Sequence, residues 1–179
     1  MSVEVWLVRH GETEWTVLGK VSGWTDVTLT ERGREQARGL QPRLSPQTFD
    51  TVWASDLQRT LETARLAWGE ARPDERLREL DFGDLEGIVW EQLDSGHREA
   101  LLAFEGFCPP AGESVETFQA RVRGFLNELP PGRHLLFVHA GLIRLVLRDL
   151  EADRFLPPAS VVALRWTQRQ LLFIEPGEA

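Results

Sequence analysis

The fold is decided by the stretch Val3-Glu4-Val5-Trp6-Leu7-Val8-Arg9-His10-Gly11. Its first six residues are mostly β-branched, aromatic or aliphatic, which predicts a buried strand over residues 3–8. This strand runs directly into an Arg-His pair and a glycine. A second stretch has the same form, because an apolar run at residues 135–138 enters His139-Ala140-Gly141. The chain therefore offers two strands that each end in a histidine close to a glycine.

Helix and strand patterns alternate along the rest of the chain. Apolar residues at helical spacing follow an N-capping residue at three places, namely Thr30, either Ser55 or Asp56, and Ser114. Other strands are expected at residues 50–54, 161–166 and 171–174, and another helix at 142–150. Residues 14–29 are expected to form a loop, and residues 72–88 an irregular, charged segment. This order predicts an α/β fold, a three-layer α/β/α sandwich with a mostly parallel central sheet. Ligands of such sheets bind beyond the carboxyl ends of the strands, so both histidines are expected at one site.

Length, charge and cysteine content narrow the class of protein. The 179 residues predict a single domain over 1–179, with a small cap-like insertion around 85–112. The net charge of −8 argues against nucleic-acid binding, although a pocket with two or three Arg could still bind a small anion. Cys108 is the only cysteine, so the chain cannot form an internal disulfide. Because Glu4 and Arg9 interrupt the apolar residues at the N-terminus, we expect neither a signal peptide nor a membrane anchor there. We therefore expect a cytoplasmic protein without nucleic-acid or membrane partners.

His10 is the first candidate for catalysis. A neutral imidazole is a good nucleophile toward phosphorus, and a backbone carbonyl can fix its tautomer through the other ring nitrogen. Arg9 offers a planar set of donors that matches phosphate oxygens, and Gly11 would let the backbone pass close to a phosphate. In the alternative, His10 merely ends a strand and Arg9 is solvated.

Two more side chains could bind a phosphoryl group. Arg59 is expected in the first turn of a helix, where backbone amides favour anions; alternatively it is a surface residue that pairs with Glu62 or Glu35. His139 could hold a phosphoryl oxygen as negative charge builds up; alternatively it is a core histidine with satisfied hydrogen bonds.

An acid is needed to protonate a leaving alkoxide and later to take a proton from water. The run from Leu77 to Gly87 offers four candidates, which spacing alone leaves open: Glu79, Asp81, Asp84 and Glu86. A charged run of this kind is also typical of a solvated loop.

The ordered set of motifs resembles the histidine phosphatase superfamily, also called the phosphoglycerate mutase-like family, from about Val3 to Leu147. The motifs are Arg9-His10-Gly11-Glu12-Thr13, Ser22-Gly23-Trp24-Thr25-Asp26, Ser55-Asp56-Leu57 with Arg59-Thr60, Arg78-Glu79, Gly112-Glu113-Ser114 and His139-Ala140-Gly141. The resemblance implies that His10 is the phosphorylated nucleophile and Glu79 the proton donor, with no metal or cofactor. It implies that Arg9, Arg59 and His139 bind the phosphoryl group. Other substrate-binding candidates in these motifs are Gly11, Thr13, Thr16, Ser22, Gly23 and Ala140.

One position departs from the family pattern. The family motif usually continues to Trp-Asn, whereas here Trp15 is followed by Thr16, which has one donor in place of the amide's two. This departure predicts weaker phosphate binding or a changed substrate choice.

The short chain and the run Phe107-Cys108-Pro109-Pro110-Ala111-Gly112-Glu113-Ser114 are similar to the α-ribazole phosphatase branch. We expect a metal-independent phosphomonoesterase for a small phosphate ester, with α-ribazole phosphate as a candidate. Leu93, Leu101, Leu102 and Phe104 could form an apolar cap for an aromatic or apolar leaving group, or could be ordinary helix packing. The alternatives are a phosphoglycerate mutase, against which the short chain argues, and a non-catalytic sensor of a phosphate ligand. The oligomeric state is left open.

Overall fold

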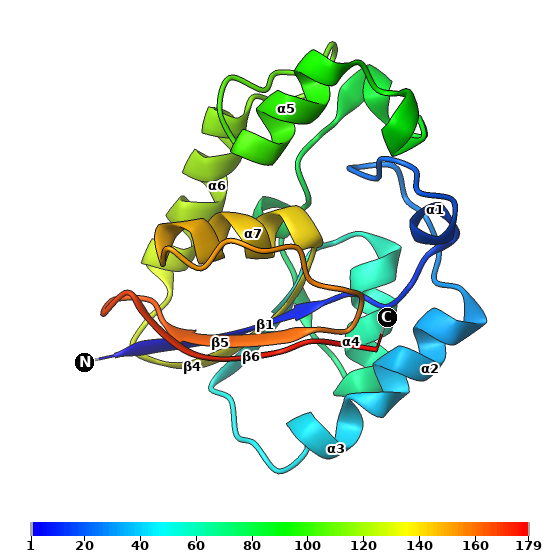
Figure 1. Ribbon diagram of the computed structural model, residues 1–179. Coiled ribbons are helices and arrows are strands. Elements are labelled where there is room, and N and C mark those ends of the chain that lie inside the picture. The colour runs from blue at the N-terminus through cyan, green and yellow to red at the C-terminus, as the bar shows by residue number, and fades with distance from the viewer. Residues whose placement is uncertain (1, 179) are drawn as a thin grey trace.

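A six-stranded sheet in the order β3-β2-β4-β1-β5-β6 forms the middle layer of this computed structural model, which describes residues 2–178 (Figure 1). The strands are β1 (Val3–Arg9), β2 (Thr51–Ala54), β3 (Arg72–Pro73), β4 (Gly132–Val138), β5 (Val161–Arg165) and β6 (Gln170–Glu175). Neighbours from β3 to β1 are parallel, and β5 runs antiparallel to both of its neighbours. The predicted α/β sandwich with a mostly parallel sheet is confirmed.

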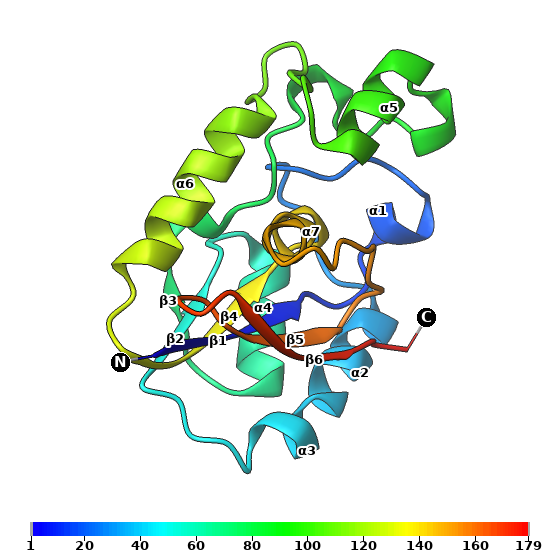
Figure 2. The ribbon, with the colours of Figure 1, turned by 60° about the vertical axis from the view of Figure 1, so that its left-hand side comes forward.

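Strand β1 is buried on both faces, as its apolar run predicts. Val5 and Leu7 pack into the core beneath α6 (Val115–Glu128) and α7 (Ala140–Asp149). Trp6 and Val8 pack into the core beneath α2 (Glu31–Gly39), α3 (Gln41–Leu44) and α4 (Gln58–Ala67). Because side chains alternate along a strand, this one strand supplies both cores. Figures 1 and 2 show the two helical layers on opposite faces of the sheet.

Two local predictions were wrong. Neither Ser55 nor Asp56 caps α4, whose N-cap is Leu57 without a side-chain cap. The Asp56 carboxylate is instead paired with Arg78 at 2.6 Å, and Asp26 Oδ1 accepts a hydrogen bond from the first amide of α4. The loop predicted at residues 14–29 contains a short helix, α1 (Glu14–Val17), which a capping box between Thr13 and Thr16 stabilises.

A segment of short elements lies on the α6 and α7 side of the sheet, next to α1 (Figure 2). It comprises η2 (Gly83–Leu85), η3 (Trp90–Gln92) and α5 (Ser95–Ala103), and it follows η1 (Glu75–Leu77). Main-chain bonds attach it to the residues after α1, because Val21 N–H donates to Ile88 O and Trp90 N–H donates to Gly19 O. Within residues 2–178 no helix has the length and apolar character to cross a membrane.

Candidate active site

His10 lies directly after β1 and is almost completely buried. Its Nδ1 is 2.7 Å from Gly11 O, so Nδ1–H donates to that carbonyl and Nε2 keeps its lone pair. Burial, followed by the charges of Arg59 and Arg9, lowers the pKa of His10 well below 6.5. At neutral pH the imidazole is therefore uncharged and oriented, which is the form a nucleophile needs.

His139 lies beside His10 because β1 and β4 are paired in parallel up to Arg9 and Val138. The two imidazole centroids are 5.3 Å apart. His139 is fully buried, and among the described residues neither of its ring nitrogens has a hydrogen-bond partner. Burial, followed by Arg59, lowers its pKa well below 6.5. Buried polar atoms normally have hydrogen-bond partners, so both ring nitrogens of His139 are available to bind a polar ligand.

Two buried guanidiniums accompany the histidines. Arg9 Nη1 donates to Leu156 O, while Arg59 donates to Gly23 O at 2.6 Å and to Thr25 O at 3.1 Å. The Nε of each lacks a partner among the described residues. Burial lowers the pKa of both to about 10, and Glu79 partly opposes this shift. Two cations with unpaired donors in a dry interior favour an anionic ligand, although the whole chain is acidic.

The alternative interpretation of Arg59 as a surface residue does not fit this geometry. Arg59 is 0 % exposed, and Glu62 pairs with Arg34 at 2.7 Å instead.

Glu79 is the acid that reaches the site. Its carboxylate accepts hydrogen bonds from Gly141 N–H at 2.8 Å and Leu80 N–H at 3.0 Å. Burial raises its pKa, while these two amides and the Arg59 and Arg9 charges oppose the rise. Of the four acids left open by spacing, Glu79 lines the cavity described next, whereas Asp84 is exposed and Glu86 binds the amides of Trp24 and Thr25.

A cavity of about 590 Å³ opens over these groups. The sequence-predicted site residues that line it are Arg9, His10, Thr16, Ser22, Glu79 and Ala140. Arg59, His139, Gly11, Thr13 and Gly23 are not on its wall. Ser22 Oγ is buried without a partner among the described residues, so it is a further donor available to a ligand.

Three of the predicted substrate-binding residues have local structural partners. Gly11 N–H donates to Thr63 Oγ1, and a Cβ at Gly11 would lie 2.2 Å from Gly33 O. Glycine is thus required there by close backbone packing, and its amide is already bonded. Thr13 is buried as the N-cap of α1, and its Oγ1 lies 3.0 Å from Thr16 Oγ1.

The cavity wall is largely apolar, and the sequence predicted only part of it. Leu101, Leu102 and Phe104 of the expected cap line the cavity, whereas Leu93 packs into the core. The sequence analysis missed much of the rest of the wall, whose residues lie far apart in sequence and include Trp15, Lys20, Phe82, Phe118, Arg144, Arg154 and Phe155. No periodic pattern connects them. Among residues 2–178 no cluster of three or more His, Cys, Asp or Glu side chains could hold a metal ion.

The family follows from a match to the model of the histidine phosphatase superfamily (branch 1), which covers residues 5–175. The chain belongs to this superfamily. It is 35% identical over 181 residues to an adenosylcobalamin/alpha-ribazole phosphatase of Salmonella typhi, covering 93% of this chain and 87% of that protein. It is 35% identical over 156 residues to phosphoglycerate mutase-like protein 4 of Arabidopsis thaliana, covering 79% and 68%. A crystal structure of phosphoglycerate mutase from Thermus thermophilus superposes with a TM-score of 0.92 at 46% identity, covering 98% of this chain and 99% of that one.

These relatives include both phosphatases and mutases, so the superfamily supports phosphoryl chemistry in general. The resemblance to this family that the motifs indicated is confirmed.

Proposed function

We propose that this chain is a metal-independent phosphomonoesterase that forms a phosphohistidine at His10. The observation that carries the proposal is the state of His10, a neutral imidazole whose Nδ1–H donates to Gly11 O and whose Nε2 has no hydrogen-bond partner among residues 2–178. It shares the cavity with Glu79, a carboxyl whose pKa is raised by burial. Ester cleavage needs an unprotonated nucleophile and a nearby acid, and the raised pKa of Glu79 favours the second role.

The first step transfers the phosphoryl group. His10 Nε2 forms a bond to phosphorus, the bond from phosphorus to the ester oxygen breaks, and Glu79 gives its proton to that oxygen. The Arg9 and Arg59 guanidiniums neutralise the charge on the remaining phosphoryl oxygens, and the uncharged His139 donates a hydrogen bond to one of them. In the second step, water attacks phosphorus, the P–N bond breaks, and the Glu79 carboxylate takes the proton from water.

The cavity wall favours an ester with a large apolar or aromatic leaving group. The aromatic and aliphatic side chains that line it match such a group through apolar burial. The relative from Salmonella typhi named adenosylcobalamin/alpha-ribazole phosphatase supports α-ribazole phosphate as a candidate substrate. Cytoplasmic location remains part of this proposal.

A phosphoglycerate mutase is the second candidate, favoured by the name of the Thermus thermophilus structure. The largely apolar wall fits a large apolar leaving group better, although Lys20, Arg144 and Arg154 also line the cavity and could pair with the carboxylate of phosphoglycerate. A mutase would interconvert 3-phosphoglycerate and 2-phosphoglycerate faster than it releases phosphate. A non-catalytic sensor would bind phosphate without turnover.

The test is a panel of phosphate esters with phosphate release as the signal. The panel contains α-ribazole phosphate, 2-phenylethyl phosphate and 3-phosphoglycerate, and the enzyme is compared with His10→Ala and the control His97→Ala. His97 lies on α5 and pairs with Asp94, away from the cavity wall. We expect an acid-labile phosphoprotein and rapid release in the wild type and the control, and neither in His10→Ala. Full activity in His10→Ala would contradict the proposal.

A further inference from the structure

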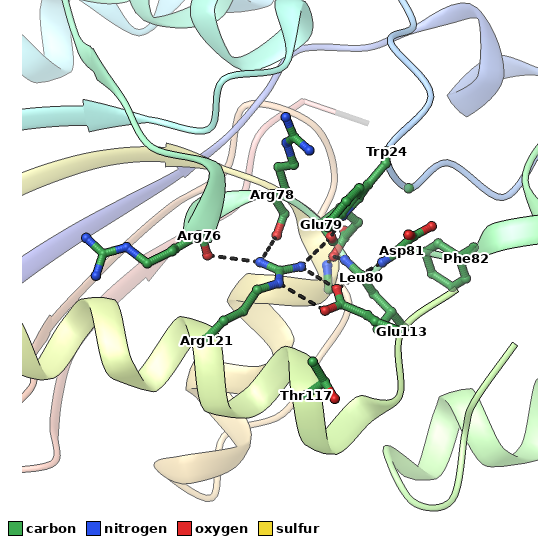
Figure 3. A network of polar contacts seen from close by, with 12 residues as sticks. Trp24, Arg76, Arg78, Glu79, Leu80, Asp81, Phe82, Glu113, Thr117 and Arg121 are labelled. Carbon is green, nitrogen blue, oxygen red and sulfur yellow. Dashed lines mark hydrogen bonds and ion pairs between the residues drawn. The ribbon is translucent and has the colours of Figure 1, made fainter. Parts of the chain in front are cut away.

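Arg121 of α6 uses every donor that it has (Figure 3). Its Nη1 donates to the carbonyls of Arg76 and Arg78, at 2.9 and 2.8 Å. Its Nη2 donates to Glu79 O at 2.6 Å and to a carboxylate oxygen of Glu113, and its Nε donates to the other oxygen at 3.1 Å. A guanidinium has five N–H groups, so none is left over.

The segment that Arg121 holds has no regular structure of its own. It runs from the end of η1 at Leu77 to the start of η2 at Gly83, and it carries Glu79. Backbone outside helices and sheets needs other partners for its carbonyls, and here one side chain supplies them for Arg78 and Glu79 of this segment and for Arg76 of η1 just before it. The indole Nε1–H of Trp24 also donates to Glu79 O, at 2.8 Å.

Glu113 fixes the same segment from the other side of Glu79. Its Oε1 accepts a hydrogen bond from Asp81 N–H at 3.0 Å, and its own N–H donates to Asp81 O at 3.0 Å. The carboxylate is thus shared between Arg121 and the backbone two residues after Glu79. The two side chains are 17 % and 11 % exposed, so solvent weakens their interaction little.

We propose that Arg121 and Glu113 are positioning residues for Glu79, an inference that rests on the proposed function. The carboxyl of Glu79 is aimed by the amides of Leu80 and Gly141, and the Leu80 amide belongs to the segment that Arg121 and Glu113 hold. A shift of that segment would move the carboxyl away from the ester oxygen. Proton transfer tolerates errors of about half an ångström, so the pair controls acid catalysis without touching substrate.

Two esters separate this role from a general contribution to folding. 2-Phenylethyl phosphate and p-nitrophenyl phosphate both place one aromatic ring in the cavity, but only the first leaves as an alkoxide that needs a proton. A misplaced Glu79 should therefore slow the first ester and spare the second. For Arg121→Met we expect kcat on 2-phenylethyl phosphate to fall roughly 10- to 100-fold. On p-nitrophenyl phosphate we expect kcat to fall by less than about threefold, and we expect KM to be nearly unchanged for both esters.

Arg121→Lys and Glu113→Gln keep the test valid if Arg121→Met fails to fold. Lysine has three donors, so the loss on 2-phenylethyl phosphate should lie between wild type and Arg121→Met. Arg123→Met is the matched control, because Arg123 lies on the same helix and pairs with Asp149 at 2.6 Å. Arg123→Met should leave kcat and KM unchanged for both esters.

The result that would overturn the proposal is an equal loss on both esters in the folded variants, or no loss on either. Failure of the wild type to hydrolyse any ester would instead remove the proposed function itself.

Discussion

The floor and the wall of the cavity are built by different kinds of structure. The floor holds His10, with His139 buried directly beside it. The two residues come from the ends of two adjacent core strands, and both side chains are almost wholly buried. The wall includes Leu102 on α5 and Phe155 in the loop before β5, which are 56% and 69% exposed. A sheet edge fixes chemistry rigidly, whereas loops and short helices can change without disturbing the core. Under the proposed function, the floor would carry out the reaction and the wall would select the substrate.

The largest effect that separates the two regions is expected from Glu79→Gln on the floor. Glutamine keeps an oxygen that can accept from the Leu80 or Gly141 amide, but it has no proton to give. On 2-phenylethyl phosphate we expect kcat to fall about 10²- to 10⁴-fold, with a much smaller fall on p-nitrophenyl phosphate. Steady-state phosphate release measures both. Asp84→Asn is the control, because Asp84 is an exposed acid of the same charged run; an equal loss in that variant would contradict the assignment.

The same variant gives a prediction for pH. His10 must be neutral, and its pKa is lowered, so kcat/KM should rise with pH in a limb that lies below pH 6.5. Glu79 must be protonated, and its pKa is raised, so kcat/KM should fall in a limb that lies above pH 4.5. Glu79→Gln should lose the falling limb and keep the rising one. Comparing both enzymes on one ester removes the ionisation of the substrate from the difference.

His139→Leu should change activity and stability in opposite directions. Loss of one donor to the phosphoryl group should lower kcat about 10²- to 10³-fold. Leucine also removes two buried nitrogens that have no partner among residues 2–178, so unfolding should become harder by about 1–3 kcal/mol. Thermal unfolding without inorganic phosphate measures the change in stability. Thermal unfolding with inorganic phosphate measures the loss of the donor, because bound phosphate should raise the Tm of the wild type more than that of the variant.

The gain in stability should depend on pH. The pKa of His139 is lowered in the folded protein, so below about pH 6.5 the unfolded chain binds a proton that the folded chain does not. The wild type therefore loses stability as pH falls through that region, and His139→Leu escapes this loss. The difference in Tm should be larger at pH 5.5 than at pH 8. A variant that is less stable than the wild type at both pH values would show that the nitrogens have partners.

Leu102→Ala tests the wall alone. Leu102 lines the cavity from α5 and is mostly exposed, and alanine is a good helix former, so the Tm should barely change. Removing three carbons from an apolar contact should raise KM for 2-phenylethyl phosphate about threefold to tenfold, with kcat unchanged. The KM for a small ester such as ethyl phosphate should not change. Equal shifts in KM for both esters would mean that Leu102 does not contact the leaving group.

The floor could be predicted from the sequence because its signals are local. The strands that precede His10 and His139 are continuous apolar runs, and the rule that ligands bind at the carboxyl edge of such sheets places both histidines together. Glu79 was chosen among four acids only through the family resemblance. Burial in the folded chain is what distinguishes it physically, and spacing does not encode burial.

The rest of the wall and the capping of α4 could not be predicted because they depend on partners far away in sequence. Asp56 looked like a helix cap, but Arg78 takes its carboxylate. Arg121 was not singled out in the sequence, because nothing local distinguishes it from other basic residues of a helix or indicates that it binds three carbonyls of another segment. Phe155 joins the cavity from an irregular loop, where no periodicity exists to reveal it.

The smallest effect is expected at Thr16, where floor and wall meet. Its hydroxyl lies 3.0 Å from Thr13 Oγ1 and completes the capping box of α1, so it contributes to the helix as well as lining the cavity. Asparagine would restore the amide usual in the family and offer two donors to a phosphoryl group. For Thr16→Asn we expect KM to fall about threefold for every ester, because all share the phosphoryl group, and stability to fall by about 0.5–1 kcal/mol from the weakened cap. Steady-state kinetics on 2-phenylethyl phosphate and ethyl phosphate measure the change in KM, and thermal unfolding measures the change in stability. A change confined to the larger ester would place Thr16 with the wall, and an equal change for both would place it with the floor.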